Sequence, residues 1–222
     1  YQPTELVSAR SIVYSGFEKS FRYMQFERDA EGLGCIQFFG DDPADFEYAI
    51  SKVCEDERLK DVDIIDINMG CPVPKVVKTG AGSALIKTPK KAAEIVRTAR
   101  KICDSYGKDL TVKTRVGFYD EDKTNGVSTD FIKCLADSGA KLIAIHGRTA
   151  VQMYHGEADI EAIARMRDAI ASYDLPFIAN GDITSPQEAK EVFDLAKEKG
   201  LICMPNQNRR FDAPFLAVKE VI

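Results

Sequence analysis

The sequence predicts an α/β fold of the TIM-barrel type, in which parallel strands alternate with helices as in a (β/α)8 barrel. Short apolar runs rich in β-branched residues alternate with segments that carry an apolar stripe at helical spacing. Strands joined by single helices form right-handed βαβ units on a parallel sheet, which leaves a closed barrel or an open doubly wound sheet. Polar side chains also follow nearly every predicted strand. A barrel brings all of them to one rim, whereas an open sheet gathers only those near its switch point, so the barrel is favoured.

We expect residues 1–222 to form a single domain with a substantial core. The length is somewhat below the roughly 250 residues of a complete barrel. No repeat, linker or low-complexity segment interrupts the alternation, and no GxGxxG motif follows an early strand. The sequence therefore offers no dinucleotide-binding fingerprint.

The first half of the chain is predicted to hold three strands and two helices. An aspartate before a proline is typical of a helix N-cap and first helical position, and a threonine before a proline marks the second helix. A nearly continuous apolar run favours a strand that is covered on both faces. The expected elements are, in order, a strand or strand-turn within Glu5–Val13, a strand at Cys35–Phe39, a helix from Asp42-Pro43, a strand at Val62–Ile67 and a helix from Thr88-Pro89.

The second half continues the same alternation. Gly139 is the expected C-cap of one helix, because glycine readily adopts the left-handed conformation that ends helices. The expected elements are a strand at Leu110–Thr114, a helix at Thr129–Ala136, a strand at Leu142–Ile145, a helix at Ile160–Ile170, a strand at Pro176–Ala179, a helix from Ser185-Pro186 to about Lys197 and a strand at Leu201–Met204.

Composition limits the classes of function. The formal net charge of -5 argues against this chain alone being a strong nucleic-acid binder, so RNA would need a local basic patch. No apolar run approaches the roughly 18 residues of a membrane span. The six cysteines are scattered without a CxxC pair, which favours reduced thiols in a cytoplasmic protein. Because the chain starts at Tyr1 and stops within a helix-like run at Ile222, we expect it to be a fragment.

Cys71 is the most informative residue, because it lies in a turn directly after a predicted buried strand. Pro72 and Pro74 fix their own φ angles and push the preceding residues towards extended conformations, so the thiol is held on a stiff backbone. Loops at the carboxyl ends of barrel strands carry the chemistry in this architecture. The other five cysteines are expected to be small core hydrophobes.

Lys113 and Arg115 alternate with apolar or small residues, so both basic side chains point to one side of a strand expected to be buried. A cation in such a place needs an anionic or polar partner. One candidate partner is a bound cofactor, and the alternative is a structural salt bridge with a neighbouring carboxylate such as Asp66.

His146 and the run Asn180-Gly181-Asp182 follow two later strands. Two interpretations of His146 stay open from its position: it is either a satisfied structural histidine, the more common case for a lone histidine, or a donor to a cofactor or phosphate. The loops after strands seven and eight bind phosphate in many barrels, and the alternative for the asparagine-glycine pair is an ordinary turn. His155 is expected to face solvent.

These motifs together resemble the tRNA-dihydrouridine synthases, a family of flavin enzymes with an N-terminal TIM barrel. The similarity extends from about Glu5 to Asp194, and its first motif is highly specific. The motifs that carry it are DIIDINMGCPVPKVVKTGAGSAL, VKTRVG, HGRTAVQMYHGEAD and NGDI.

The resemblance implies that FMN, reduced by NADPH, passes hydride to C6 of a uridine in tRNA while a cysteine delivers a proton to C5. Cys71 matches that cysteine, and the base must leave its stack to reach it. Cysteine thiols ordinarily titrate near pH 8.5, and a lysine beside a reduced flavin stabilises its negative charge. No metal and no membrane partner are implied. The residues that match FMN contacts are Gln37, Lys113, His146, Asn180, Gly181 and Asp182, and those that match contacts to the uridine are Asn68 and Arg115.

Three departures from the family pattern accompany the matches. The family's first strand has no counterpart here, so the first visible strand counts as the second of the barrel. The Gly-Arg pair expected after strand eight to hold the FMN phosphate is replaced by the run from Cys203 to Arg210, where Arg209 or Arg210 is a possible substitute. We also expect residues 1–222 to lack the C-terminal tRNA-binding helical domain of the family.

Two other functions remain open at this point. One is a non-catalytic remnant or RNA-interaction module that keeps the barrel but binds FMN poorly. The other is an FMN barrel that acts on a free pyrimidine, as dihydroorotate dehydrogenases do, although the run Asn68–Lys75 argues against it.

Overall fold

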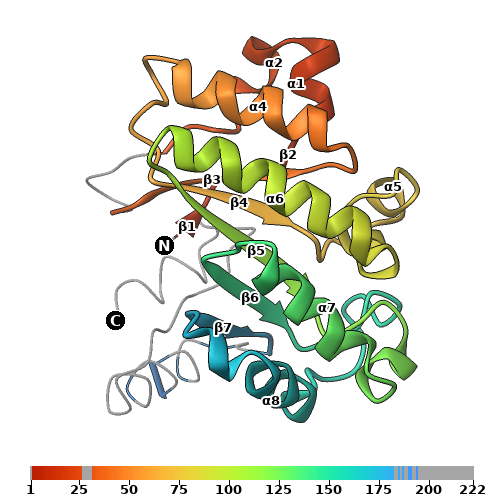
Figure 1. Ribbon diagram of the computed structural model, residues 1–222. Helices are drawn as coiled ribbons and strands as arrows, with labels where there is room; N and C mark the ends of the chain where they lie inside the picture. The colour runs from red at the N-terminus through yellow and green to blue at the C-terminus, as the bar shows by residue number, and fades with distance from the viewer. Residues whose placement is uncertain are drawn as a thin grey trace.

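The computed structural model describes residues 2–26 and 32–182, together with 185, 187, 190, 191 and 194. In this part of the chain, all strand pairings are parallel, and helices follow the strands one after another. Figure 1 shows the strands forming one curved sheet with α4, α6, α7 and α8 lined up on its outer side. The fold is a parallel α/β sheet of the TIM-barrel type, as predicted.

The sheet follows chain order, β1-β3-β4-β5-β6-β7, with β2 also paired to β3. No pairing between β7 and β1 is present within the described residues, so this part of the sheet is open. The strands are β1 (Gln2–Pro3), β2 (Val7–Ser8), β3 (Gly34–Phe39), β4 (Ile64–Asn68), β5 (Asp109–Arg115), β6 (Leu142–His146) and β7 (Phe177–Asn180).

The helices begin where the sequence places capping residues. Asp42 accepts a hydrogen bond from the Ala44 N–H at the start of α4, and Pro89 opens α6. The α-helices are α1 (Ala9–Ser15), α2 (Phe17–Phe21), α4 (Pro43–Glu55), α5 (Pro74–Val77), α6 (Pro89–Ser105), α7 (Val127–Asp137) and α8 (Ile160–Ala169). Short 3-10 helices are η1 (Gly82–Lys87), η2 (Asp120–Lys123) and η3 (Ala171–Tyr173).

The segment predicted as a strand or strand-turn within Glu5–Val13 is strand only at Val7–Ser8 and becomes helix α1 at Ala9. The Ser8 hydroxyl caps this helix by accepting from the Ser11 N–H at 3.2 Å. β1 and β2 pair with opposite ends of β3, so together they form one interrupted edge strand. This is the first visible strand of the prediction, and it is shorter than expected.

Three expectations fall outside the described residues. These are most of the helix predicted from Ser185, the strand at Leu201–Met204 and the run from Cys203 to Arg210.

The register of the sheet gives its concave side a polar character. On β5, every second residue from Thr111 to Arg115 lies on the same face, and Asp66 is the Cα partner of Thr111. The opposite face packs its apolar side chains against the helices, as the fully buried Val112 and Leu110 do. The core therefore lies between sheet and helices, and polar groups are directed to the concave side.

Most of the cysteines behave as predicted. Cys35, Cys54 and Cys103 are buried, and burial raises the pKa of Cys54 to about 11 and that of Cys103 to about 12. Cys134 differs, because it is half-buried and its thiol contacts the Pro89 carbonyl at the helix surface. No helix in the described residues is both long and apolar enough to cross a membrane.

Candidate active site

A pocket of about 320 Å³ lies at the carboxyl ends of β3 to β6. Its size falls within the range of small-molecule and cofactor sites. Six of the nine predicted site residues line it, and its other walls come from the N-terminal segment and two loops. The lining residues are Pro3, Thr4, Glu5, Leu6, Gln37, Asn68, Gly70, Cys71, Pro72, Val73, Lys113, Arg115, His146 and Tyr154.

Cys71 is held by backbone hydrogen bonds on both sides. Asn68, at the end of β4, accepts from the Gly70 N–H at 3.1 Å and from the Cys71 N–H at 2.8 Å through its side-chain oxygen. The Cys71 carbonyl accepts from the Ser83 N–H at 3.0 Å. The half-buried thiol therefore sits on a backbone with little freedom to move, as the prolines of the turn predict.

Gly82 allows η1 to approach this turn closely. Its φ angle is +61°, and a Cβ at this position would lie 2.7 Å from the Cys71 carbonyl oxygen. Any side chain would therefore both strain the backbone and displace the turn. The glycine in the GAGSAL part of the motif thus has a packing role directly behind the thiol.

Amide side chains connect the turn to the interior of the sheet. Asn68 Nδ2 donates to Gln37 Oε1 at 3.1 Å, and Gln37 Nε2 donates to Asp66 Oδ2 at 2.6 Å. All three residues are buried. We call this set, with Thr111 whose hydroxyl donates to Asp66, the amide relay.

Lys113 lies beside the relay on β5, opposite Asn68 in register. Within the described residues its ammonium makes no ion pair shorter than 4.0 Å, so the expected alternative of a direct salt bridge with Asp66 is not present. Burial, followed by repulsion from Arg115, lowers the pKa of Lys113 to about 8, although Asp66 opposes this shift. The ammonium is therefore a cation held in a place that disfavours its charge.

Arg115 is buried and binds backbone carbonyls of two loops. Its Nε donates to Gly70 O at 2.8 Å, and its Nη1 donates to Thr149 O at 3.0 Å and Met153 O at 2.8 Å. Its guanidinium also lies 5.8 Å from the ring centroid of Tyr154. Arg115 thus fastens the cysteine turn to the loop that follows β6.

His146 ends β6 next to Arg115 in register. Burial is the main cause that lowers the pKa of His146 to about 3, and the positive charges of Arg115, Lys113 and Arg148 add to it. The imidazole is therefore neutral at neutral pH. Its Nε2 lies 3.3 Å from Arg148 Nη1.

Arg148 is tied to Asp182, the last residue of the predicted phosphate-side run, by an ion pair. Asp182 also accepts from the Ala158 N–H. Burial alone would raise the pKa of Asp182, but this hydrogen bond and Arg148 together lower it. The Asp182 carboxylate is therefore engaged with protein groups.

Asn180 and Gly181 lie behind His146. The Asn180 carbonyl accepts from the Gly147 N–H at 3.0 Å, and Asn180 is the register partner of His146. Gly181, with φ of +134°, packs so closely that a Cβ would lie 3.1 Å from the imidazole. Unlike the other six predicted site residues, Asn180, Gly181 and Asp182 do not line the pocket.

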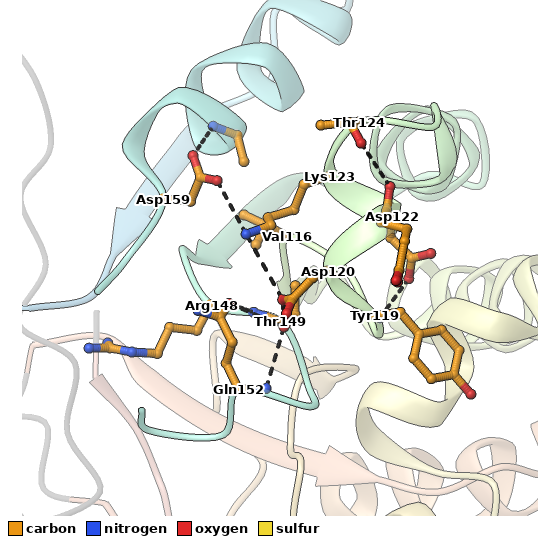
Figure 2. Close-up of polar contacts among 12 residues, drawn as sticks. Val116, Tyr119, Asp120, Asp122, Lys123, Thr124, Arg148, Thr149, Gln152 and Asp159 are labelled. Carbon is orange, nitrogen blue, oxygen red and sulfur yellow. Dashed lines mark hydrogen bonds and ion pairs between the residues drawn. The ribbon is translucent and has the colours of Figure 1, made fainter. Parts of the chain in front are cut away.

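The loops after β5 and β6 are cross-linked by polar contacts, as Figure 2 shows. Thr149 Oγ1 donates to Asp120 Oδ1 at 2.8 Å, and Lys123 forms an ion pair with Asp159 at 3.5 Å. Gln152 accepts from the Thr149 N–H at 2.9 Å. These contacts fix the loop whose carbonyls receive Arg115.

The sequence reasoning missed two residues that the structure brings to the site. Tyr154 lines the pocket with a largely exposed ring, and Arg148 touches His146. Both belong to the motif HGRTAVQMYHGEAD, so the signal was in the sequence. His155, in the same motif, is exposed, as predicted.

A larger groove of about 810 Å³ lies elsewhere, between α6 and α7. Its walls are mainly apolar, and none of the predicted site residues lines it. The smaller pocket gathers the thiol, amides and cations, so it is the candidate active site despite its size.

Comparison with known proteins agrees with the motif analysis. The family model described as "Dihydrouridine synthase (Dus)" matches residues 2–204. The chain is 37% identical over 207 residues to tRNA-dihydrouridine synthase B of Vibrio parahaemolyticus and 38% identical over 159 residues to that of Pseudomonas aeruginosa. It is 34% identical over 199 residues to a probable tRNA-dihydrouridine synthase of Rickettsia bellii.

These matches cover 93%, 72% and 90% of the chain. They cover 60%, 44% and 57% of the relatives, so the chain spans about half the length of the curated proteins that it matches.

Proposed function

Because the chain belongs to the dihydrouridine synthase family, we propose that it provides the catalytic barrel of an enzyme that reduces uridine to 5,6-dihydrouridine in tRNA. The observation that carries this proposal is the position of Cys71, whose fixed turn lines a polar pocket at the strand ends beside Lys113. The names of the relatives support tRNA as the substrate class. A cytoplasmic location fits this substrate and the free cysteines.

The pocket residues fit an anionic, planar cofactor, which we propose is FMN. The fit rests on Lys113, a cation without an ion-pair partner among the described residues, and on the amide groups of Gln37 and Asn68 in the same pocket. When bound and reduced by NADPH, FMN supplies the hydride for C6 of the uracil. Lys113 would lie against the negative charge of the cofactor, which favours its protonated form.

The four other predicted FMN residues, which lie at the ends of β6 and β7, have different roles in this proposal. His146 is neutral, so it serves as a hydrogen-bonding group and adds no charge. Asp182 is an anion paired with Arg148, so its carboxylate repels a phosphate and its contribution is to hold Arg148 and the loop at Ala158 in place. Backbone groups of Asn180 and Gly181 are the expected phosphate-side contacts.

The uridine is expected to enter beside Cys71, Asn68 and Arg115. Arg115 already gives three hydrogen bonds to backbone carbonyls, so its main effect is to hold the walls of this site together. Tyr154 offers an exposed ring on which a base taken out of its RNA stack can rest. The thiol then delivers a proton to C5 as a positioned general acid.

The proposal is tested by replacing the thiol. In protein loaded with FMN and reduced beforehand, Cys71→Ala is expected to slow dihydrouridine formation in single-turnover reactions with tRNA by about 10² to 10⁴. FMN binding and reduction of the flavin by NADPH should stay near the parental values, because neither involves this proton.

The structure supplies a better control than a core cysteine. Cys134→Ala removes a half-buried thiol on α7, away from the pocket, whereas Cys35→Ala would open a cavity at a fully buried position of β3. The assignment fails if Cys71→Ala forms dihydrouridine at the parental rate. Parental protein that binds neither FMN nor tRNA would instead support a non-catalytic module.

A further inference from the structure

Asp66 is a fully buried carboxylate that the proposed reaction does not use. It lies at the centre of β4, with Gln37 of β3 and Thr111 of β5 as its register partners on either side. Gln37 Nε2 donates to its Oδ2 at 2.6 Å, and Thr111 Oγ1 donates to its Oδ1. It is not among the pocket-lining residues of the described chain, so any influence on the reaction passes through its neighbours.

The direction of each hydrogen bond in the amide relay is fixed from both ends. Both carboxyl oxygens of Asp66 accept, one from Thr111 and one from Gln37, so the NH₂ group of Gln37 faces Asp66 and its oxygen faces Asn68. At the other end, the Gly70 and Cys71 N–H groups only donate, so the oxygen of Asn68 must face them. Both requirements are met by a single arrangement of the two amides. If Gln37 turned over, its NH₂ group would meet the NH₂ group of Asn68.

We propose that Asp66 is a positioning residue that sets the orientation of the Gln37 and Asn68 amides and thereby holds the Cys71 turn in its observed conformation. The importance of that turn for catalysis rests on the proposed function. The orientation itself is a property of the folded chain, so it can be tested without FMN or RNA.

Exchanging the carboxylate and the amide gives a sharp test. Gln37→Glu places a second carboxylate against Asp66 and should disrupt the relay, because the two either repel or must share a proton. Adding Asp66→Asn to Gln37→Glu restores the pairing of donors with acceptors. The new asparagine can accept from Thr111 and donate to the new glutamate, which accepts from Asn68 as Gln37 did. Asp66→Asn alone keeps an acceptor for Gln37 and should have a small effect.

The readouts are the urea midpoint and the rate at which iodoacetamide alkylates Cys71, measured by mass spectrometry of the Cys71 peptide. Cys134 serves as the internal reference, because it is half-buried on α7 away from the relay. In Gln37→Glu we expect a lower midpoint and a Cys71 alkylation rate raised about fivefold, the change expected from losing one net hydrogen bond. The ratio to Cys134 separates release of the turn from general unfolding.

In the double variant, both readouts should return close to those of Asp66→Asn. If Gln37→Glu does not fold, a double variant that folds and alkylates at the parental rate supports the proposal equally. Additive effects, with the double variant worse than either single one, would show that Asp66 acts only as packing and would overturn it. The proposal would also be overturned if Gln37→Glu kept the parental urea midpoint and alkylation rate, or if both Gln37→Glu and the double variant failed to fold. Parental protein inactive towards tRNA would refute the proposed function and leave this cycle intact.

Discussion

The two walls of the pocket satisfy their polar groups in different ways. On the β3 and β4 side, the amide relay pairs donors with acceptors from Asp66 to the Cys71 turn. On the β5 and β6 side, burial lowers the pKa values of Lys113 and His146. Repulsion from Arg115 adds to both shifts, and Lys113 and Arg148 also act on His146. The first wall is complete as it stands, whereas the second holds more positive charge than its described neighbours offset at short range.

This difference indicates a division of roles. The β3 and β4 side, which we call the relay wall, holds the Cys71 turn in place before any ligand binds. A proton donor needs this preorganisation. On the β5 and β6 side, which we call the cationic wall, the positive charges of Lys113, Arg115 and Arg148 repel one another. An anionic ligand would reduce this repulsion. Substitutions in the cationic wall should therefore change the free energy of unfolding in directions that depend on pH and on bound ligand. The following three variants test this difference between the two walls.

The largest effect is expected for Arg115→Ala. This change leaves three carbonyl groups, those of Gly70, Thr149 and Met153, without the Arg115 donor, and it should lower the free energy of unfolding by about 3 kcal/mol. Urea unfolding measures the change. Lys87→Ala is the control, because its exposed ammonium rests on the Phe118 ring at 4.0 Å and should contribute under about 1 kcal/mol. Equal losses in the two variants would show that Arg115 does not fasten the loops.

Lys113→Met should have an effect of opposite sign. The folded pKa of about 8 lies below the ordinary 10.5, so the charged lysine destabilises the protein fully below pH 8. The penalty fades as pH rises from 8 to 10.5, because the unfolded chain then holds the extra proton. Without ligand, Lys113→Met should raise the free energy of unfolding by about 2 kcal/mol at pH 7. Urea midpoints at pH 7 and 10 test this, and a variant less stable than the parent at pH 7 would contradict it.

His146→Gln should have the smallest effect, visible only in acid. The folded pKa of about 3 lies below the ordinary 6.5, so the unfolded chain binds an extra proton between these values and stability is lost as pH falls. The variant lacks this loss and should be less acid-sensitive by about 1 kcal/mol at pH 4.5, after allowance for partial exposure. Urea unfolding at pH 7 and 4.5 measures the difference. Parallel declines in parent and variant would show that His146 does not stay neutral in the folded protein.

Local sequence patterns predicted much of the fold, because buried strands appear as apolar runs and helices begin at recognisable capping residues. Ile64–Asn68 and Pro89–Ser105 fall close to the expected elements. The segment after Ser8 departs from the strand or strand-turn expected within Glu5–Val13, although Ile12 and Val13 are β-branched residues that favour strands. Helix α1 forms there because the Ser8 cap and the burial of Ile12 outweigh that preference.

The place of the candidate site could also be predicted, since parallel strands bring their carboxyl ends together and six of the nine expected residues line one pocket there. The interactions within it could not, because they depend on register. Asp66 was an obvious partner for Lys113 by charge, but register places Asp66 opposite Thr111 and Lys113 opposite Asn68. The sequence also does not show in which direction the Gln37 and Asn68 amides point. Nor does it show that Arg115 binds three backbone carbonyls.

The central claim is that the cationic wall is arranged to receive an anionic cofactor, and FMN titration tests it most directly. Quenching of flavin fluorescence at pH 7 should show saturable binding to the parental protein and a Kd at least about tenfold higher for Lys113→Met, the loss of one charge-assisted contact. This weaker binding should occur even though the free variant is the more stable protein. Equal FMN affinity in the two proteins, or no binding to the parent, would contradict the account.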